Sequence, residues 1–181
     1  KNEHPITLEL ACGKGEYTVC LVQKFPQRNF IGVDIKGARL WKGAKAALEQ
    51  NLKNVAFLRI RIEEVTDFFT KNEVDEIWIT FPDPYPKKSK ANKRLSSPRF
   101  LNLYREILRT DGLIHLKTDD ADLFNYTLET INAERCIIHE KIEDLNNHST
   151  NDELLGIKTT YEQKYLEAGR TIRYLSFSLN N

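Results

Sequence analysis

The stretch Leu8-Glu9-Leu10-Ala11-Cys12-Gly13-Lys14-Gly15 joins a short β-rich run, Ile6–Leu10, to a helical pattern of apolar residues over Glu16–Lys24. Its two glycines allow positive φ and close approach of the backbone to a ligand. A second β-rich run, residues 30–33, ends in Asp34, about 20 residues after the turn. A strand, a glycine turn, a helix and a second strand ending in an acid are typical of a nucleotide-binding fold, in which the acid binds ribose hydroxyls.

The rest of the chain continues this alternation of strands and helices. Further strands are expected at residues 55–60, 76–80, 112–116, 135–141 and 172–179, and further helices at residues 38–51, 63–70, 98–108 and 120–133. Strict alternation predicts an α/β fold with a parallel sheet, helices on both faces and right-handed crossovers. The last two strands are separated by the polar stretch 144–160 with no clear helix, so we expect them to form an antiparallel pair at one edge.

Four carboxylates fall at or just beyond the predicted strand ends: Glu9, Asp34, Asp83 and Asp119. In open sheets of this kind, ligands bind at the carboxyl ends of the strands, near the point where the strand order reverses. We therefore expect these acids to gather around one binding cleft.

Glu9 decides which cofactor the glycine turn would hold. An acid directly before the turn would repel a pyrophosphate but attract a sulfonium or an amino group. A dinucleotide fold also prefers a third small residue at position 18, where this chain has Thr18. We infer S-adenosyl-L-methionine rather than NAD, with Gly13, Gly15 and Asp34 as further contacts. A purely structural turn with a capping acid is the alternative.

The stretch TFPDPYPKKSKANKRLSSPR, residues 80–99, follows the fourth predicted strand. Its first three prolines make a stiff, non-helical segment around Asp83. Six cations follow without another acid: Lys87, Lys88, Lys90, Lys93, Arg94 and Arg99. One carboxylate beside a dense positive charge suits an anionic ligand with a polar group to be recognised, and nucleic acid is the obvious candidate. A solvated basic loop is the alternative.

Composition limits the remaining possibilities. The 181 residues fit a single domain, and a net charge of +1 means that nucleic-acid binding would depend on a local patch. No apolar run approaches the roughly 20 residues that span a bilayer, and no signal peptide is visible, so a cytoplasmic protein is expected. The three cysteines form no CxxC pair and the four histidines lack metal-ligand spacing, so we expect reduced thiols and no metal site.

Six segments, in chain order, make the sequence recognisable: LELACGKGEY, GVDIKGAR, ITFPDPYPKKSKANKRL, SPRFL, IHLKTDD and TTYEQKYLEAGRTI. Together they resemble the bacterial tRNA (guanine-N7)-methyltransferase family, from the first strand to about Tyr174. The glycine turn alone would indicate only a class I methyltransferase. The PDPYPK segment with its basic residues, combined with KTD and T-x-Y-E, is far more specific.

The resemblance implies a class I methyltransferase fold, a Rossmann-like three-layer sandwich with a seven-stranded, mostly parallel sheet. It implies methyl transfer from S-adenosyl-L-methionine to N7 of a guanosine in the tRNA variable loop (conventional position 46). Glu9 and Asp34 match the family's cofactor acids, and Asp83 matches its presumed catalytic aspartate. The positions that match substrate contacts are Lys87, Asp119, Thr159, Thr160 and Glu162. Monomer and homodimer both stay open.

Three departures from the family pattern accompany the resemblance. Tyr85 stands where Trp is common, which keeps an aromatic surface. Arg61 and Ile62 stand where Asp-Ala is common, at the end of the third strand, where backbone amides would read the adenine edge. The usual N-terminal extension is absent, and the chain has no methionine. We therefore expect that an N-terminal segment is missing from the sequence.

The chemistry of guanine N7 gives Asp83 its expected role. N7 has a lone pair and no proton, so methyl transfer to it requires no general base. Positive charge then moves from sulfur to the guanine ring, where a carboxylate would stabilise it and accept from N1–H and the exocyclic amine. Asp83 is the candidate, and the cations after it, Lys87 and Arg94 among them, would contact phosphates.

Three other functions stay open. Pro82-Asp83-Pro84-Tyr85 partly mimics the strand end of methyltransferases that act on an exocyclic amine of a nucleic acid. A nucleotide-dependent oxidoreductase would use a similar fold. A non-catalytic RNA-binding protein would keep the fold without the reaction. Likewise, Thr159 to Glu162 on sequence alone would be a helix cap.

Overall fold

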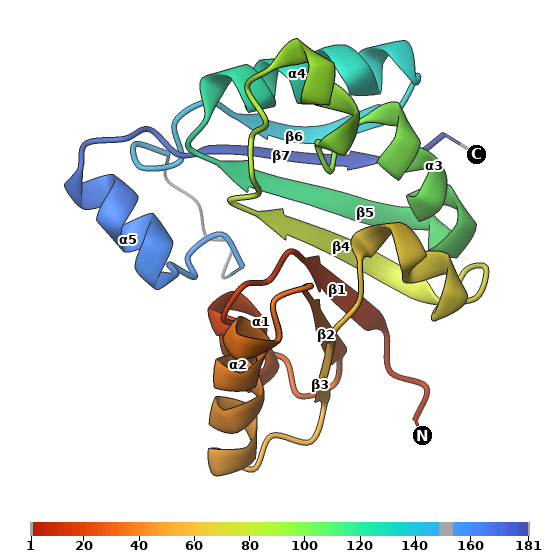
Figure 1. Cartoon of the computed structure of the whole chain (residues 1–181), viewed down its shortest axis with the longest axis vertical. Helices are drawn as coiled ribbons and strands as arrows, with labels where there is room; N and C mark the ends of the chain where they lie inside the picture. Colours follow the sequence, from red (N-terminus) through yellow and green to blue (C-terminus); the bar gives the residue numbers. More distant parts are fainter. Residues whose placement is uncertain (1, 149–153, 181) are drawn as a thin grey trace.

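The computed structural model describes residues 2–148 and 154–180, which form one twisted sheet with helices against both faces (Figure 1). The sheet has seven strands in the order β3-β2-β1-β4-β5-β7-β6. Strands β1 to β5 are parallel to one another, and β7 runs antiparallel between β5 and β6. The expected α/β fold with an antiparallel edge is confirmed. Part of the expected polar stretch 144–160 lies outside the described residues.

The described elements follow the predicted order closely. The strands are β1 (Ile6–Leu10), β2 (Asn29–Val33), β3 (Val55–Leu58), β4 (Val74–Thr80), β5 (Leu108–Thr118), β6 (Ile137–Ile142) and β7 (Arg173–Ser178). The α-helices are α1 (Glu16–Lys24), α2 (Gly37–Glu49), α3 (Pro98–Ile107), α4 (Ala121–Ala133) and α5 (Thr160–Glu167). Two short 3₁₀ helices are η1 (Ile62–Asp67) and η2 (Lys88–Lys93).

The helix expected at residues 63–70 is wrong in type and length, because only the short 3₁₀ helix η1 forms there. Three of its six residues are β-branched, Ile62, Val65 and Thr66, which disfavours a longer α-helix. The expectation of no clear helix between the last two strands is wrong, because α5 (Thr160–Glu167) lies between β6 and β7. Its start is fixed by Thr159, whose side chain accepts a hydrogen bond from the backbone N–H of Glu162 at 3.2 Å.

One face of the central strands is apolar. Strand register places Leu8 beside Ile77, Leu10 beside Ile79, and Ile79 beside Leu116. These side chains are at most 2% exposed and pack in one core cluster with residues of η1, α3 and α4. This layer supplies the main apolar core.

The opposite face of the same strands is polar and equally buried. Alternation along the strands places these residues there: Thr7, Glu9, Glu76, Trp78, Thr80, His115, Lys117 and Tyr174. Helix α1 covers this face through Tyr17 and Leu21, together with Leu155 and Ile157. Burying a charge is costly unless it is paired and hydrogen-bonded, so each ionisable group on this face needs a partner.

Glu76 has its partners within the protein. One carboxylate oxygen accepts from the indole N–H of Trp78 at 2.8 Å and lies 2.9 Å from Nε2 of His115, and the other pairs with Arg28. The His115 ring stacks on Trp78, with centroids 4.1 Å apart. Burial alone would raise the pKa of Glu76, but the hydrogen bond and charge of His115, with the charge of Arg28, hold it at about 2. Glu76 therefore stays ionised inside the sheet.

Candidate active site

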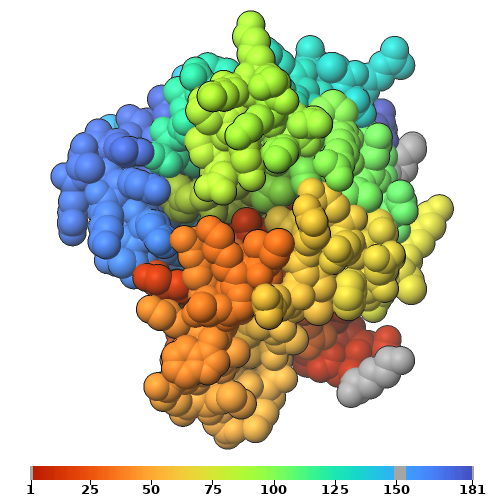
Figure 2. Space-filling view, in the orientation of Figure 1, coloured from red at the N-terminus to blue at the C-terminus, as the bar shows by residue number. Residues whose placement is uncertain are grey.

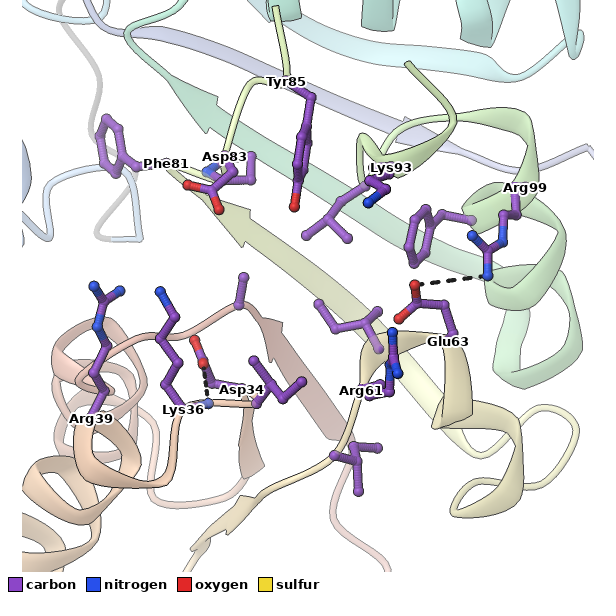
Figure 3. A pocket seen from close by; sticks show the side chains of 17 residues that line it. Asp34, Lys36, Arg39, Arg61, Glu63, Phe81, Asp83, Tyr85, Lys93 and Arg99 are labelled. Carbon is purple, nitrogen blue, oxygen red and sulfur yellow. Dashed lines mark hydrogen bonds and ion pairs between the residues drawn. The ribbon is translucent and has the colours of Figure 1, made fainter. Parts of the chain in front are cut away.

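Two adjoining cavities, of about 470 and 250 Å³, open at the carboxyl ends of β1, β2 and β4. They share four lining residues, Ala11, Arg39, Phe81 and Asp83, and so form one elongated cleft. The larger cavity, drawn in Figure 3, lies between the end of β2, η1 and the segment after β4. The smaller cavity lies between the glycine turn and α5. The cleft is where an open α/β sheet binds its ligands.

The backbone at the cleft turns through left-handed conformations at three residues that are not glycine. Ala11, Phe81 and Tyr85 have φ of 57°, 49° and 44°. Such conformations cost on the order of 1 kcal/mol or more each and persist only where neighbouring contacts hold them. The N–H of Phe81 donates to the carbonyl of Lys117 at 2.8 Å, which fixes the chain directly before Asp83.

Glu9 lies under the smaller cavity and is only 3% exposed. One carboxylate oxygen accepts from the hydroxyl of Thr80 at 2.8 Å, and the other accepts from the backbone N–H (2.9 Å) and the hydroxyl of Thr18. Burial raises the pKa of Glu9 to about 7, although these hydrogen bonds oppose the shift. No cation among the described residues pairs with this carboxylate, so a cationic group bound in the cavity would supply its counter-charge.

Asp34 lines the larger cavity from the end of β2. One of its carboxylate oxygens accepts from the backbone N–H of Gly13 at 2.9 Å, and the other accepts from that of Lys36 at 2.8 Å. A carboxylate has about four acceptor positions, so two are left for ligand hydroxyls. Figure 3 shows the bond to Lys36 at the edge of the cavity.

The two glycines of the turn have different roles. Gly13 has a φ of +57°, lines the smaller cavity, and has open space where a Cβ would be. At Gly15, with a φ of +67°, a Cβ would lie 2.4 Å from the ring of Phe57. Gly15 lines neither cavity in the described part of the chain and serves packing, so of the two expected glycine contacts only Gly13 borders the cleft.

The far end of the larger cavity is lined by apolar side chains and by the two residues at the position where adenine binding was expected. Arg61 and Ile62 both line it, as do Ile60, Leu95 and Phe100. Glu63 pairs there with Arg99 at 3.8 Å (Figure 3). Apolar walls of this kind suit a planar ring, whereas the Arg61 side chain offers a donor but no acceptor.

Asp83 lies where the two cavities meet and lines both. It is exposed, and no described residue donates a hydrogen bond to its carboxylate. Tyr85 lines the larger cavity beside it, and both side chains point toward the cavity in Figure 3. Asp83 therefore has its full acceptor capacity available to a ligand.

Arg94 has a structural role in place of the phosphate contact expected from the sequence. It is 7% exposed, and its guanidinium donates to the carbonyl oxygens of Pro84 at 3.0 Å and Tyr85 at 3.1 Å. The same guanidinium lies 4.2 Å from the ring centre of Tyr126. Arg94 thus holds the turn that carries Asp83.

Glu162 also has a structural partner where a substrate contact was expected. Its carboxylate accepts from the ammonium of Lys117 at 2.8 Å, and both residues are at most 2% exposed. Lys117 is the penultimate residue of β5, and its ammonium also donates to the carbonyl of Ile157 at 3.3 Å. Burial lowers the pKa of Lys117 and raises that of Glu162, against their mutual attraction. This pair fastens α5 to the sheet.

Fastening α5 in this way gives the smaller cavity its outer wall. Thr159, Tyr161 and Tyr165 line that cavity, and the ring of Tyr165 lies 5.5 Å from that of Phe81. The N–H of Thr160 donates to the Glu16 carboxylate at 2.8 Å, which ties α5 to α1. Of the expected contacts Thr159, Thr160 and Glu162, only Thr159, the N-cap of α5, borders the cleft.

The other two expected substrate residues lie outside both cavities as the described residues define them. Lys87 is exposed in the segment after Tyr85. Asp119 pairs with Arg170, and its backbone carbonyl accepts from Arg173 at 3.4 Å.

Several cleft residues were not expected from the sequence. They are Lys36, Arg39, Glu63, Phe81 and Tyr165, whereas Lys93 and Arg99 were among the cations expected to contact RNA. Lys36 and Arg39 come two and five residues after Asp34, the acid at the end of β2, and this position in the sequence could have predicted that they lie at the cleft. Nothing in the sequence indicated the same for Tyr165, because only the tertiary contact between Lys117 and Glu162 brings α5 to the cleft.

Residues 2–148 and 154–180 contain neither a group of metal-ligating side chains nor a helix that could span a membrane. No three His, Cys, Asp or Glu side chains there are grouped to hold a metal ion. No helix in the same ranges has the length and apolar character needed to cross a membrane.

Comparison with known proteins matches this chain to methyltransferases. The family described as putative methyltransferase matches residues 3–175. The tRNA (guanine-N(7)-)-methyltransferase of Porphyromonas gingivalis is 53% identical over 179 residues, covering 98% of this chain and 72% of that protein. The enzyme of the same name from Christiangramia forsetii is 50% identical, covering 99% of this chain and 80% of that protein.

Solved structures resemble the fold at much lower identity. The 16S rRNA methyltransferase KamB has a TM-score of 0.74 at 14% identity, covering 98% of this chain and 88% of that one. A geranyl diphosphate methyltransferase in complex with SAM has a TM-score of 0.67 at 13% identity, covering 97% and 78%. Identities this low show the fold alone, and they confirm the expected class I methyltransferase fold.

We expect Glu162→Gln to lower the free energy of unfolding by about 3 kcal/mol without any RNA, because removing one partner leaves the charge of Lys117 buried. The double variant Lys117→Met/Glu162→Leu should lose less than the sum of the single variants. Urea unfolding measures both, with Glu167→Gln, exposed on the same helix, as the control. Unchanged stability with weaker RNA binding would instead make Glu162 a substrate contact.

Proposed function

Since this chain belongs to the tRNA (guanine-N7)-methyltransferase family, we propose that its cleft transfers a methyl group from S-adenosyl-L-methionine to N7 of a guanosine in the variable loop of tRNA. The observation that carries the proposal is the buried Glu9, which faces the cleft and has only neutral donors among the described residues. A buried acid without a cation fits a cofactor that brings positive charge. Because the proposed substrate is tRNA, we expect the enzyme to act in the cytoplasm.

The residues present fit this cofactor. Glu9 uses three of about four acceptor positions, which leaves one for an amino group or for contact with a sulfonium. Asp34 has acceptor positions for ribose hydroxyls, and Ile62 and Phe100 flank the space for a planar ring. When bound, the cofactor supplies a methyl group on a positively charged sulfur. Glu9 also disfavours NAD, because its charge would repel a pyrophosphate.

Asp83 is the group that orients guanine and responds to the change in its charge. N7 carries no proton, so Asp83 acts as a hydrogen-bond acceptor and not as a base. Its carboxylate accepts from N1–H and the exocyclic amine and faces the ring as the ring becomes positive. Holding N7 in line with the methyl group supplies several kcal/mol more through positioning. The contacts of Lys117 with Phe81 and of Arg94 with Tyr85 hold the left-handed backbone on both sides of Asp83 and so keep it at the cleft.

Recognition of tRNA rests on the exposed cations after Tyr85. Lys87, Lys88 and Lys90 are exposed, and Lys93 and Arg99 line the larger cavity. Lysine contacts of this kind position RNA through its phosphates and carry little sequence information. The aromatic side chain of Tyr85 offers a surface on which an unstacked base can lie.

The position and chemistry of methylation can be read from chain cleavage. We expect a tRNA transcript incubated with enzyme and S-adenosyl-L-methionine to break at one guanosine of the variable loop after borohydride and aniline treatment, because N7-methylation labilises the base. A transcript with adenosine at that position is the matched control. Methyl incorporation without a strand break would mean transfer to an exocyclic amine, and a break elsewhere would refute the variable-loop site.

We expect Asp83→Ala to lower kcat by about 10²- to 10³-fold, because it removes an interaction that strengthens as the guanine ring becomes positive. Cofactor affinity, measured by titration calorimetry, should change only a few-fold. Asp111→Ala, an exposed acid near the start of β5, is the control. Equal losses of turnover and cofactor affinity would assign Asp83 mainly to the cofactor.

Cofactor affinity should depend on pH through Glu9. Its pKa is about 7 in the free protein, and a cationic ligand favours the ionised form. Binding of S-adenosyl-L-methionine should therefore weaken about tenfold for each pH unit below 7 and level off above it. Calorimetry at pH 6, 7 and 8 measures this, and Glu9→Gln should bind weakly with a flat profile. A flat profile in the unmodified protein would contradict this role.

The same shift has an opposite effect on stability. The pKa of Glu9 is raised from its ordinary 4.5, so the folded protein binds more protons than the unfolded chain between these values. Stability from this group is therefore present below pH 4.5 and lost as pH rises through about 7. Ligand-free Glu9→Gln should not show this loss, so its melting temperature at pH 8 should equal or exceed that of the unmodified protein.

A further inference from the structure

Helix α2 exposes apolar side chains that the proposed reaction does not use. Trp41 is 61% exposed and Leu48 is 81% exposed, whereas Leu40, Gly43 and Ala47 on the same helix are buried. Single exposed apolar residues are common on protein surfaces, but an exposed tryptophan is unusual enough to examine further. The charge around Trp41 indicates what it could contact.

The start of α2 carries four cations and no acid. Residues 36–45, KGARLWKGAK, contain Lys36, Arg39, Lys42 and Lys45. The ammonium of Lys45 lies 5.3 Å from the ring centre of Trp41. The first acid is Glu49, at 3.6 Å from Lys45, in a pair whose side chains are both more than half exposed. Such a surface pair is weak and leaves Lys45 available to a stronger anionic partner.

This surface is continuous with the cleft. Lys36 and Arg39 line the larger cavity, and in Figure 3 both side chains extend across it toward the strand end that carries Asp83. Lys42 and Lys45 continue the same helix by about 9 Å beyond Arg39, at 1.5 Å per residue. In Figure 2, α2 (orange) and the segment after β4 (yellow-green) border one hollow from opposite sides of the same face.

We propose that the α2 surface, formed by Lys36, Arg39, Trp41, Lys42 and Lys45, is a second RNA-binding surface of the enzyme. It rests on the proposed function, because the RNA is the tRNA whose guanosine enters the cleft. The cations contact phosphates and Trp41 stacks on an unpaired base, as aromatic side chains do with single-stranded RNA. The exposed lysines after Tyr85 bind the same tRNA from across the cleft.

Charge complementarity favours RNA over a protein partner on this surface. The centre of a protein interface is depleted of lysine, whereas here the ammonium of Lys45 lies 5.3 Å from the ring centre of Trp41 and Lys42 is the next residue in the chain. Four cations with one aromatic ring, next to an equally acid-free stretch across the cleft, match the pattern of a positive groove with a stacking platform. Association with a second copy of the chain is the competing outcome in the test.

The test uses Lys42→Ala/Lys45→Ala and Trp41→Ala, which leave the cleft residues intact. Binding of a tRNA transcript is measured by fluorescence anisotropy between 50 and 300 mM salt. We expect the double variant to reduce the salt slope by about 1.5, and Trp41→Ala to weaken binding about tenfold. Lys53→Ala/Lys71→Ala removes the same charge at the amino ends of β3 and β4, the sheet edge opposite the cleft, and should leave the slope within about 0.5 of the unmodified protein.

Tryptophan emission gives a second, independent readout. Trp41 is exposed and Trp78 is fully buried, so tRNA that stacks on Trp41 should quench the exposed emission. Trp41→Phe should remove the quenching while retaining most of the affinity, because phenylalanine also stacks. Quenching that persists in Trp41→Phe would refute the stacking contact.

The outcomes separate this inference from the proposed function. Binding of S-adenosylhomocysteine should be unchanged in all α2 variants. If the unmodified protein methylates tRNA and the α2 variants bind tRNA equally well, the second surface is refuted while the function stands. If Trp41→Ala converts a dimer to a monomer in light scattering with unchanged tRNA affinity, the surface is a contact between copies and the inference is wrong. A protein that binds tRNA through α2 but transfers no methyl group to it would refute the function alone.

Discussion

The burial of charge on one face of the sheet is the constraint on which the rest of the structure depends. Glu76 and Glu162 are ionisable groups in that layer, and each faces a cation or histidine of the protein. Glu9 differs, because its described partners are the neutral groups of Thr18 and Thr80. Its pKa is raised by burial where that of Glu76 is lowered by its partners. In the proposed reaction, the positive charge that Glu9 lacks within the protein is supplied by the bound cofactor.

The same layer builds the walls of the cleft. Lys117 binds Glu162 and thereby holds α5, whose aromatic rings close the smaller cavity. The carbonyl of Lys117 also accepts from Phe81, at the turn that leads to Asp83. Arg94 secures the other side of that turn through the carbonyl of Tyr85. The turn that carries Asp83 is therefore held by two buried cations, Lys117 on one side and Arg94 on the other.

The helices, the strands and the position of the cleft could be predicted from the sequence because they depend on interactions between residues close together in the chain. Period-2 and helical apolar patterns, a glycine turn and acids at strand ends depend on near neighbours, so β1 to β5 and the places of Glu9, Asp34 and Asp83 could be read directly. Arg94 and Glu162 were assigned to RNA because their burial depends on partners 10 and 45 residues away. The type of η1 was missed because the competition between 3₁₀ and α geometry over six residues is decided by small energies.

Identification of the methylated nucleoside tests the central claim most directly. tRNA incubated with the enzyme and isotopically labelled S-adenosyl-L-methionine is digested to nucleosides and separated by mass spectrometry. The account predicts that the label appears as 7-methylguanosine, and that its yield falls sharply when Asp83 is replaced. Label in N2-methylguanosine or another amine-methylated nucleoside, or no label in tRNA at all, would contradict it.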